Sequence, residues 1–165
     1  GIRDQPRSRG LGDVYKRQAL GREGVPMVMM RDDRYAVAVA DAYSRITAGT
    51  KNGVCTFQGG VNAAGLQVAF AGMAQAFEDG SPVLCITDGI PAGATENSQF
   101  DVTSALKTVS KWYGHLDKPE RLPEFMRRAF TMLRTGRPGP VVIAIPDSDA
   151  QYDDCLLYTS DAADE

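Results

Sequence analysis

The sequence is poor in the residues on which several common kinds of site are built. Of its 165 residues only one is a histidine, His115, and only three are cysteines. No cysteine or acid lies at metal-ligand spacing from His115, so neither a zinc site nor a hydrolase triad is indicated. Cys55 and Cys85 each lie inside an apolar run, where a thiol usually behaves as a small hydrophobe. We therefore expect both to be reduced core residues.

Long apolar runs and a strong excess of one charge are lacking as well. No stretch approaches the roughly 20 apolar residues that a membrane helix needs, and no signal peptide is recognisable. The formal net charge is only -3, which disfavours a surface that binds nucleic acid or an anionic membrane. We therefore expect a cytoplasmic protein with neither nucleic acid nor membrane as a partner.

Both ends of the sequence read as translated sequencing-library adapter. Ser8 to Gln18 and Cys155 to Glu165 back-translate into the two inward-facing adapter ends of a common library chemistry. We therefore predict that residues 1–18 and 155–165 are adapter-derived and that residues 19–154 form part of one domain. The alternative is that both ends are natural polar termini.

Between these ends, short apolar runs alternate with stretches of helical spacing. Strands are predicted at Val54 to Phe57, Pro82 to Thr87 and Pro140 to Pro146, with a shorter one at Pro26 to Met30. Helices are predicted at Asp33 to Ile46, from near Asn62 through Phe77, and at Pro123 to Arg134. No periodicity predicts an element between Pro91 and Lys111. The alternation predicts an α/β fold, an open and mostly parallel sheet with helices on both faces, Rossmann-like or flavodoxin-like.

Polar residues or glycines follow three of the predicted strands. The three segments are Arg31 to Arg34, Phe57 to Gly65 and Thr87 to Gly93. Ligands bind at the carboxyl ends of the strands in an open parallel sheet, so these segments could line one crevice. Each also has a structural interpretation: the acids cap a helix and pair with the arginines, the glycines make a tight turn, and the third segment is a surface loop. The glycines lack the spacing of the dinucleotide and P-loop fingerprints, which disfavours a nucleotide-binding domain.

Taken in order, these pieces resemble the pyrimidine-binding (PYR) domain of thiamin-diphosphate-dependent enzymes of the acetolactate synthase superfamily. RDDRYAVAVADAYSRITAG is similar to the family's R-x-E helix. Within this stretch of the chain, Ala36, Val39, Ala40, Tyr43 and Ile46 recur at helical spacing. GVCTFQGGVNAAG and the residues up to ITDGIP are similar to its glycine-rich turn, long helix and P-V-L strand, and TGRPGPVVIAIP to its closing strand. The resemblance covers nearly all of residues 19–150 and implies a PYR domain that is incomplete at its N-terminus.

The resemblance also implies which residues meet the cofactor. The family's glutamate at the helix start hydrogen-bonds a ring nitrogen of the aminopyrimidine, and Asp33 stands at its position. Asp33 is therefore the predicted catalytic and cofactor-binding residue. Its side chain is one methylene shorter, which weakens a hydrogen bond that needs about 2.6 to 3.2 Å. The other predicted cofactor-binding residues are Gln58, Gly59, Gly60, Asn62 and Gln99.

A complete site would need more than this chain. The family holds the diphosphate and Mg²⁺ on a separate domain, through a Gly-Asp-Gly motif and a downstream Asn that have no counterpart here. The resemblance thus implies no metal ligand in this chain and a second subunit of a homodimer or tetramer that completes the site. FAD is compatible with the family but is not indicated.

The parent protein is expected to be a thiamin-diphosphate-dependent decarboxylase or carboligase acting on a small 2-oxo acid. The chain by itself is expected to be inactive. The alternative is a non-catalytic dimerisation or regulatory module derived from the same family.

Overall fold

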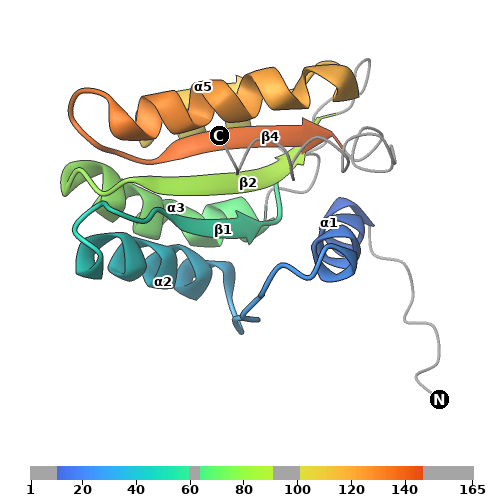
Figure 1. Ribbon diagram of the computed structural model, residues 1–165, viewed down its shortest axis with the longest axis horizontal. Helices are drawn as coiled ribbons and strands as arrows, with labels where there is room; N and C mark the ends of the chain where they lie inside the picture. Colours follow the sequence, from blue (N-terminus) through green and yellow to red (C-terminus); the bar gives the residue numbers. More distant parts are fainter. Residues whose placement is uncertain (1–10, 60–63, 91–100, 147–165) are drawn as a thin grey trace.

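The computed structural model describes residues 11–59, 64–90 and 101–146, which form helices around a parallel sheet (Figure 1). The strands lie in the order β1-β2-β4-β3, and every neighbouring pair is parallel. This arrangement confirms the predicted α/β class. The elements, in chain order, are α1 (Leu11–Arg22), α2 (Asp33–Ile46), β1 (Gly53–Phe57), α3 (Ala64–Glu78), β2 (Val83–Gly89), α4 (Val102–Thr108), β3 (Trp112–His115), η1 (Pro119–Arg121), α5 (Leu122–Arg134) and β4 (Val141–Pro146).

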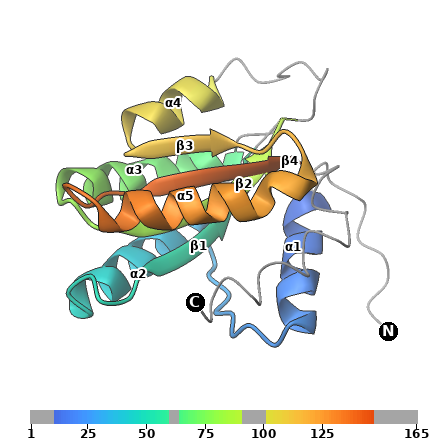
Figure 2. The same cartoon turned by 45° about the horizontal axis from the view of Figure 1, so that its top comes forward.

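Helices cover both faces of the sheet (Figure 2). Successive side chains of a strand point to opposite faces, so β2 contributes Val83 and Cys85 to one core and Leu84 to the other. The first core is shared with α2, α3 and α4, and the second with α5. Burial on both sides explains why β2 and β4 read as continuous apolar runs in the sequence.

The two cysteines inside the fold lie side by side in the first core. Cys55 and Cys85 are direct partners in the β1–β2 register, and their sulfur atoms are 3.5 Å apart. Both are buried and free, as predicted. The hydrogen bond with Cys55, together with burial, holds the pKa of the Cys85 thiol well above its usual range, so the Cys85 thiolate is disfavoured at neutral pH.

A buried serine joins α2 to the start of the sheet. The Ser44 hydroxyl donates to the Pro82 carbonyl at 2.6 Å and accepts the Gly53 backbone N–H at 2.8 Å. Gly53 lies so close to α2 that a Cβ there would come within 2.0 Å of the Ala40 carbonyl oxygen. This contact places the beginning of β1 directly against α2.

Several details differ from the sequence-based expectation. The predicted strand at Pro26 to Met30 is wrong: these residues lie outside the sheet, between α1 and α2, and no described strand pairs with them. A β-strand needs a neighbouring strand to pair with its N–H and C=O groups. Apolar composition alone therefore does not make a segment a strand. Conversely, α4 and β3 were not predicted, because seven and four residues are too short to show periodicity.

The apolar stripe expected along α2 is divided between two sides of the helix. Val37 and Ala40 face the core, whereas Val39, Tyr43 and Ile46 are exposed. Polar Asp41 and Ser44 take the inward positions beside Ala40. The outward side of α2 is thus more apolar than a solvent-facing helix surface usually is.

We expect Ser44→Ala to lower the free energy of unfolding by about 1–3 kcal/mol, because the buried Gly53 N–H and Pro82 carbonyl would each lose a partner. Denaturant unfolding of the full chain, followed by circular dichroism, measures this loss. Thr131→Ala is the matched control, since that hydroxyl bonds its own helix at an exposed position. It should change stability by less than about 0.5 kcal/mol. Equal losses in the two variants would contradict the structural role of Ser44.

Candidate functional site

The candidate site lies at the edge of the sheet where the parallel strands end. Gln58 and Gly59 follow β1, and Asp88 and Gly89 close β2. Phe57 pairs with Thr87 in the register, so these two strand ends are at the same level. The carboxyl edge of an open parallel sheet is where such folds bind ligands, because loops and helix N-termini converge there.

The two adjacent acids at the start of α2 have different positions. Asp32 is the N-cap, and its carboxylate accepts the Arg34 backbone N–H at 2.8 Å. Asp33 is the first residue of the helix and is half-buried. The structural interpretation, helix capping, therefore describes Asp32. Helix capping does not account for the position of Asp33, which depends on the residues around it.

Asp33 meets two other elements at Gly65, in the first turn of α3. A Cβ placed on Gly65 would lie 2.3 Å from Asp33 Oδ2, 2.7 Å from the Gln58 carbonyl oxygen and 2.8 Å from Gln58 Cβ. Real side chains do not approach this closely, so only glycine fits between them. The fold thus brings together the predicted site residues Asp33 and Gln58, and it adds Gly65, which the sequence did not single out.

The turn after β1 also packs tightly onto the end of β2. A Cβ at Gly59 would lie 2.2 Å from Thr87 Oγ1 and 3.0 Å from the Asp88 carbonyl oxygen. Thr87 is fully buried, and its hydroxyl has no hydrogen-bond partner in the described part of the chain. The close contact with β2 therefore requires a glycine at position 59. This structural role is compatible with the interpretation of the segment as a tight turn. The predicted residues Gly60, Asn62 and Gln99 lie outside the described residues.

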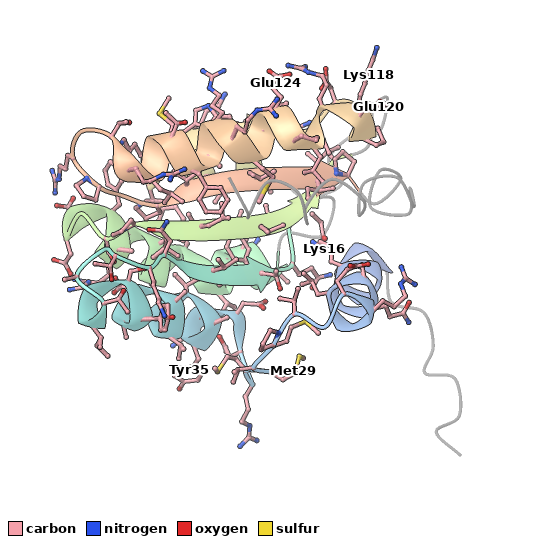
Figure 3. The ribbon with its side chains drawn as sticks, viewed as in Figure 1. Lys16, Met29, Tyr35, Lys118, Glu120 and Glu124 are labelled. Carbon is pink, nitrogen blue, oxygen red and sulfur yellow. The ribbon has the colours of Figure 1, made fainter. Side chains whose placement is uncertain are left out.

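A buried ion pair closes the same edge from the side of α1. Lys16 donates to the Asp88 carboxylate, and their side chains are only 9% and 5% exposed. Figure 3 shows Lys16 reaching from α1 toward the strand ends. Asp88 lies in the predicted crevice segment, but nothing local in the sequence marks it as paired with a residue 72 positions away. Lys16 falls within the segment predicted to be adapter-derived, and that origin stays a prediction.

Two kinds of feature are not found in the residues that the structure describes. They contain no group of three or more histidine, cysteine, aspartate or glutamate side chains that could hold a metal ion. Among the same residues, no helix is long and apolar enough to cross a membrane.

An open parallel sheet with a half-buried carboxylate and a glycine-rich turn at its carboxyl edge defines an α/β ligand-binding domain. Residues 14–109 match the family described as thiamine pyrophosphate enzyme, N-terminal TPP binding domain. The chain belongs to this family. Membership confirms the predicted PYR domain, and the matched segment contains α2, β1, α3 and β2 with the site residues on them.

Curated relatives carry the same domain within much longer chains. The chain is 35% identical over 122 residues to a probable acetolactate synthase large subunit of Methanocaldococcus jannaschii, covering 72% of this chain and 20% of the relative. It is 34% identical over 131 residues to the acetolactate synthase isozyme 2 large subunit of Escherichia coli, covering 78% and 23%. It is also 32% identical over 126 residues to a glyoxylate carboligase of Escherichia coli, covering 74% and 21%. The chain thus spans about a fifth of these relatives.

We expect Lys16→Met to destabilise the chain by about 3–5 kcal/mol, because the Asp88 carboxylate would remain buried without its cationic partner. Denaturant unfolding measures the loss. The double variant Lys16→Met/Asp88→Asn should recover most of it, since no unpaired charge is left. Lys118→Met, at an exposed lysine, is the control and should have little effect. If the double variant were as unstable as the single one, the ion pair would not be the cause.

Proposed function

We propose that this domain binds the pyrimidine half of thiamin diphosphate in a 2-oxo-acid decarboxylase or carboligase of the acetolactate synthase type. The observation that carries the proposal is the position of Asp33, a half-buried carboxylate at the carboxyl edge of the sheet, beside Gln58 and the start of α3. Family membership supports the cofactor. The acetolactate synthases and the glyoxylate carboligase among the relatives support a carboligation or decarboxylation of small 2-oxo acids.

The residues of the edge suit the neutral, ring-shaped half of the cofactor. Asp33 would accept or hold a proton at a ring nitrogen, and half-burial strengthens such a hydrogen bond relative to water. Gln58 and the turn at Gly59 would border the ring, together with Gly60, Asn62 and Gln99. When bound, thiamin diphosphate supplies the carbon nucleophile and the electron sink, while the protein positions the reacting groups.

The diphosphate and its Mg²⁺ call for groups of another kind. Mg²⁺ takes oxygen ligands, commonly carboxylates together with phosphate oxygens. Among the described residues, no three or more histidine, cysteine, aspartate or glutamate side chains are grouped so that they could hold a metal ion. Following the family resemblance, the proposal includes a diphosphate-binding domain, on a second subunit, that supplies these ligands and completes the site.

The outward side of α2 is a suitable surface for that second subunit. Tyr35, Val39, Tyr43 and Ile46 are between 46% and 85% exposed, and they lie on the helix that begins at Asp33. Tyr35 projects away from the sheet in Figure 3. An exposed apolar surface of this kind commonly marks a protein–protein interface. A subunit that covers it would border the cofactor site as well.

The second candidate function is a non-catalytic dimerisation or regulatory module. It is favoured by the shorter carboxylate at position 33 and by the same apolar surface of α2, which suits association without catalysis. The two candidates differ in what the parent protein binds. A catalytic parent should bind thiamin diphosphate in a Mg²⁺-dependent manner, whereas a non-catalytic module should assemble without binding it.

In the full-length parent, we expect Asp33→Ala to lower kcat about 10²- to 10⁴-fold, the usual contribution of a positioned proton-transfer group. Steady-state kinetics with 2-oxo acids such as pyruvate and glyoxylate, alongside calorimetry of thiamin diphosphate with Mg²⁺, measures the effect. Asp32→Ala, which removes the helix cap next to it, is the control for loss of structure. Unchanged turnover in Asp33→Ala would disprove the catalytic role, and no cofactor binding by an intact parent would favour the non-catalytic module.

We also expect the isolated 165-residue chain to self-associate through the uncovered side of α2. Val39→Lys and Tyr43→Lys should each shift the chain toward monomer. Each substitution removes an apolar side chain whose burial in the interface would contribute about 1.5–3 kcal/mol to association. Sedimentation velocity over a concentration series measures the shift. Thr131→Lys, at an exposed position of α5, is the charge-matched single control and should leave association unchanged. A sharp monomer in the unmodified chain would contradict the prediction.

A further inference from the structure

We propose that Gly65 is a positioning residue for the Asp33 carboxylate and that the two residues form a matched pair, a short acid against a glycine. Its relevance to the cofactor rests on the proposed function, whereas the pairing itself can be tested on the chain alone. The pairing bears on the aspartate at the start of α2, where the resemblance places a glutamate in the family.

The contact surface between α2 and α3 shows why Gly65 is distinctive. Two positions on α3, seven residues apart, meet α2: Gly65 at Asp33 and Gly72 at Val37. At Gly72, a Cβ would lie 3.1 Å and 3.2 Å from two carbons of Val37. That approach is tight, but a shift of a few tenths of an ångström relieves it. The 2.3 Å approach of a Cβ on Gly65 to Asp33 Oδ2 needs a much larger movement.

The surroundings of Gly65 decide which group would have to move. On its other side lie the Gln58 carbonyl oxygen and Gln58 Cβ, at 2.7 Å and 2.8 Å from the same Cβ position. Gln58 directly follows β1, whose backbone is held in the sheet by its pairing with β2. The contact with Asp33 is at the end of its side chain, which can change rotamer, whereas the contacts with Gln58 are at its backbone oxygen and Cβ. Asp33 can therefore move with less disturbance of the backbone than Gln58. A methyl group at position 65 would therefore displace the carboxylate from its present place.

The position of the Asp33 carboxylate beside Gly65 is electrostatically favourable. The first turn of a helix carries N–H groups without partners inside the helix, and the helix dipole is positive there. Asp33 Oδ2 lies against this turn of α3 while its own residue begins α2. A glutamate at position 33 would add a methylene where α3 is already in contact. The length of the acid and the missing side chain at residue 65 are therefore coupled.

The first experiment compares Gly65→Ala with Gly72→Ala in the 165-residue chain. Both substitutions place a methyl group on the side of α3 that faces α2. The Asp33 carboxyl carbon is observed by NMR in chain labelled with carbon-13 aspartate, and Asp33→Asn assigns its resonance. We expect the Asp33 resonance and its titration midpoint to move in Gly65→Ala and to stay unchanged in Gly72→Ala. An unmoved resonance in Gly65→Ala, or equal movement in both variants, would overturn the proposal.

A second measurement needs no change at residue 65, so it remains informative if Gly65→Ala does not fold. Backbone amide shifts of the chain are followed from pH 7 to pH 3. The Gly65 and Leu66 amides should titrate with the midpoint of the Asp33 carboxyl, and this titration should vanish in Asp33→Asn while the Gly72 amide is unaffected. Gly65 and Leu66 amides that ignore the state of Asp33 would overturn the proposal.

The two proposals can fail separately. The NMR measurements use no cofactor, so a coupling between residues 33 and 65 would stand even if the parent did not bind thiamin diphosphate. In a parent that does bind it, Gly65→Ala should weaken the cofactor about tenfold or more, equivalent to at least about 1.4 kcal/mol. Gly72→Ala should leave the affinity unchanged. Cofactor affinity that is equal in both variants would refute the matched pair while leaving the proposed function intact.

Discussion

Parallel pairing between β1, β2 and β4 is the constraint on which the rest of the structure depends. Parallel hydrogen bonding requires each strand to enter the sheet from the same side, and therefore to end at the same edge. The polar ends of β1 and β2 are thus placed together, while their apolar middles are buried under helices on both faces. The site is a consequence of this direction, since neither strand end alone could form it.

Close backbone contacts then set the geometry of the candidate site at this edge. Gly53 lets β1 start against α2, Gly59 lets the following turn reach β2, and Gly65 lets α3 reach Asp33. In each place the absence of a side chain allows two segments to pack closely against each other. The buried Ser44 holds the opposite end of the same arrangement. The carboxylate at position 33 is therefore positioned by the packing of three elements.

The composition of α2 connects the fold with assembly. Its inner side carries the polar residues Asp41 and Ser44, and its outer side carries Val39, Tyr43 and Ile46. The inner side also carries Val37 and Ala40, so α2 has apolar residues on both sides, which suits a helix that lies between two protein surfaces. Because α2 also begins at Asp33, a subunit covering this helix would lie next to the candidate site.

The sequence by itself determined the α/β class, three strands, the helices α2, α3 and α5, and the position of Asp33 at a helix start. These features depend on local periodicity, capping residues and motif order, which the chain carries along its length. Only the tertiary structure decided the strand order, the absence of pairing at Pro26 to Met30, the ion pair of Lys16 with Asp88 and the contact of Gly65 with Asp33. Each of these joins residues far apart in the chain, or requires a neighbour that no local pattern supplies. Their physical reason is packing in three dimensions, where the space left by a missing side chain counts as much as the residues present.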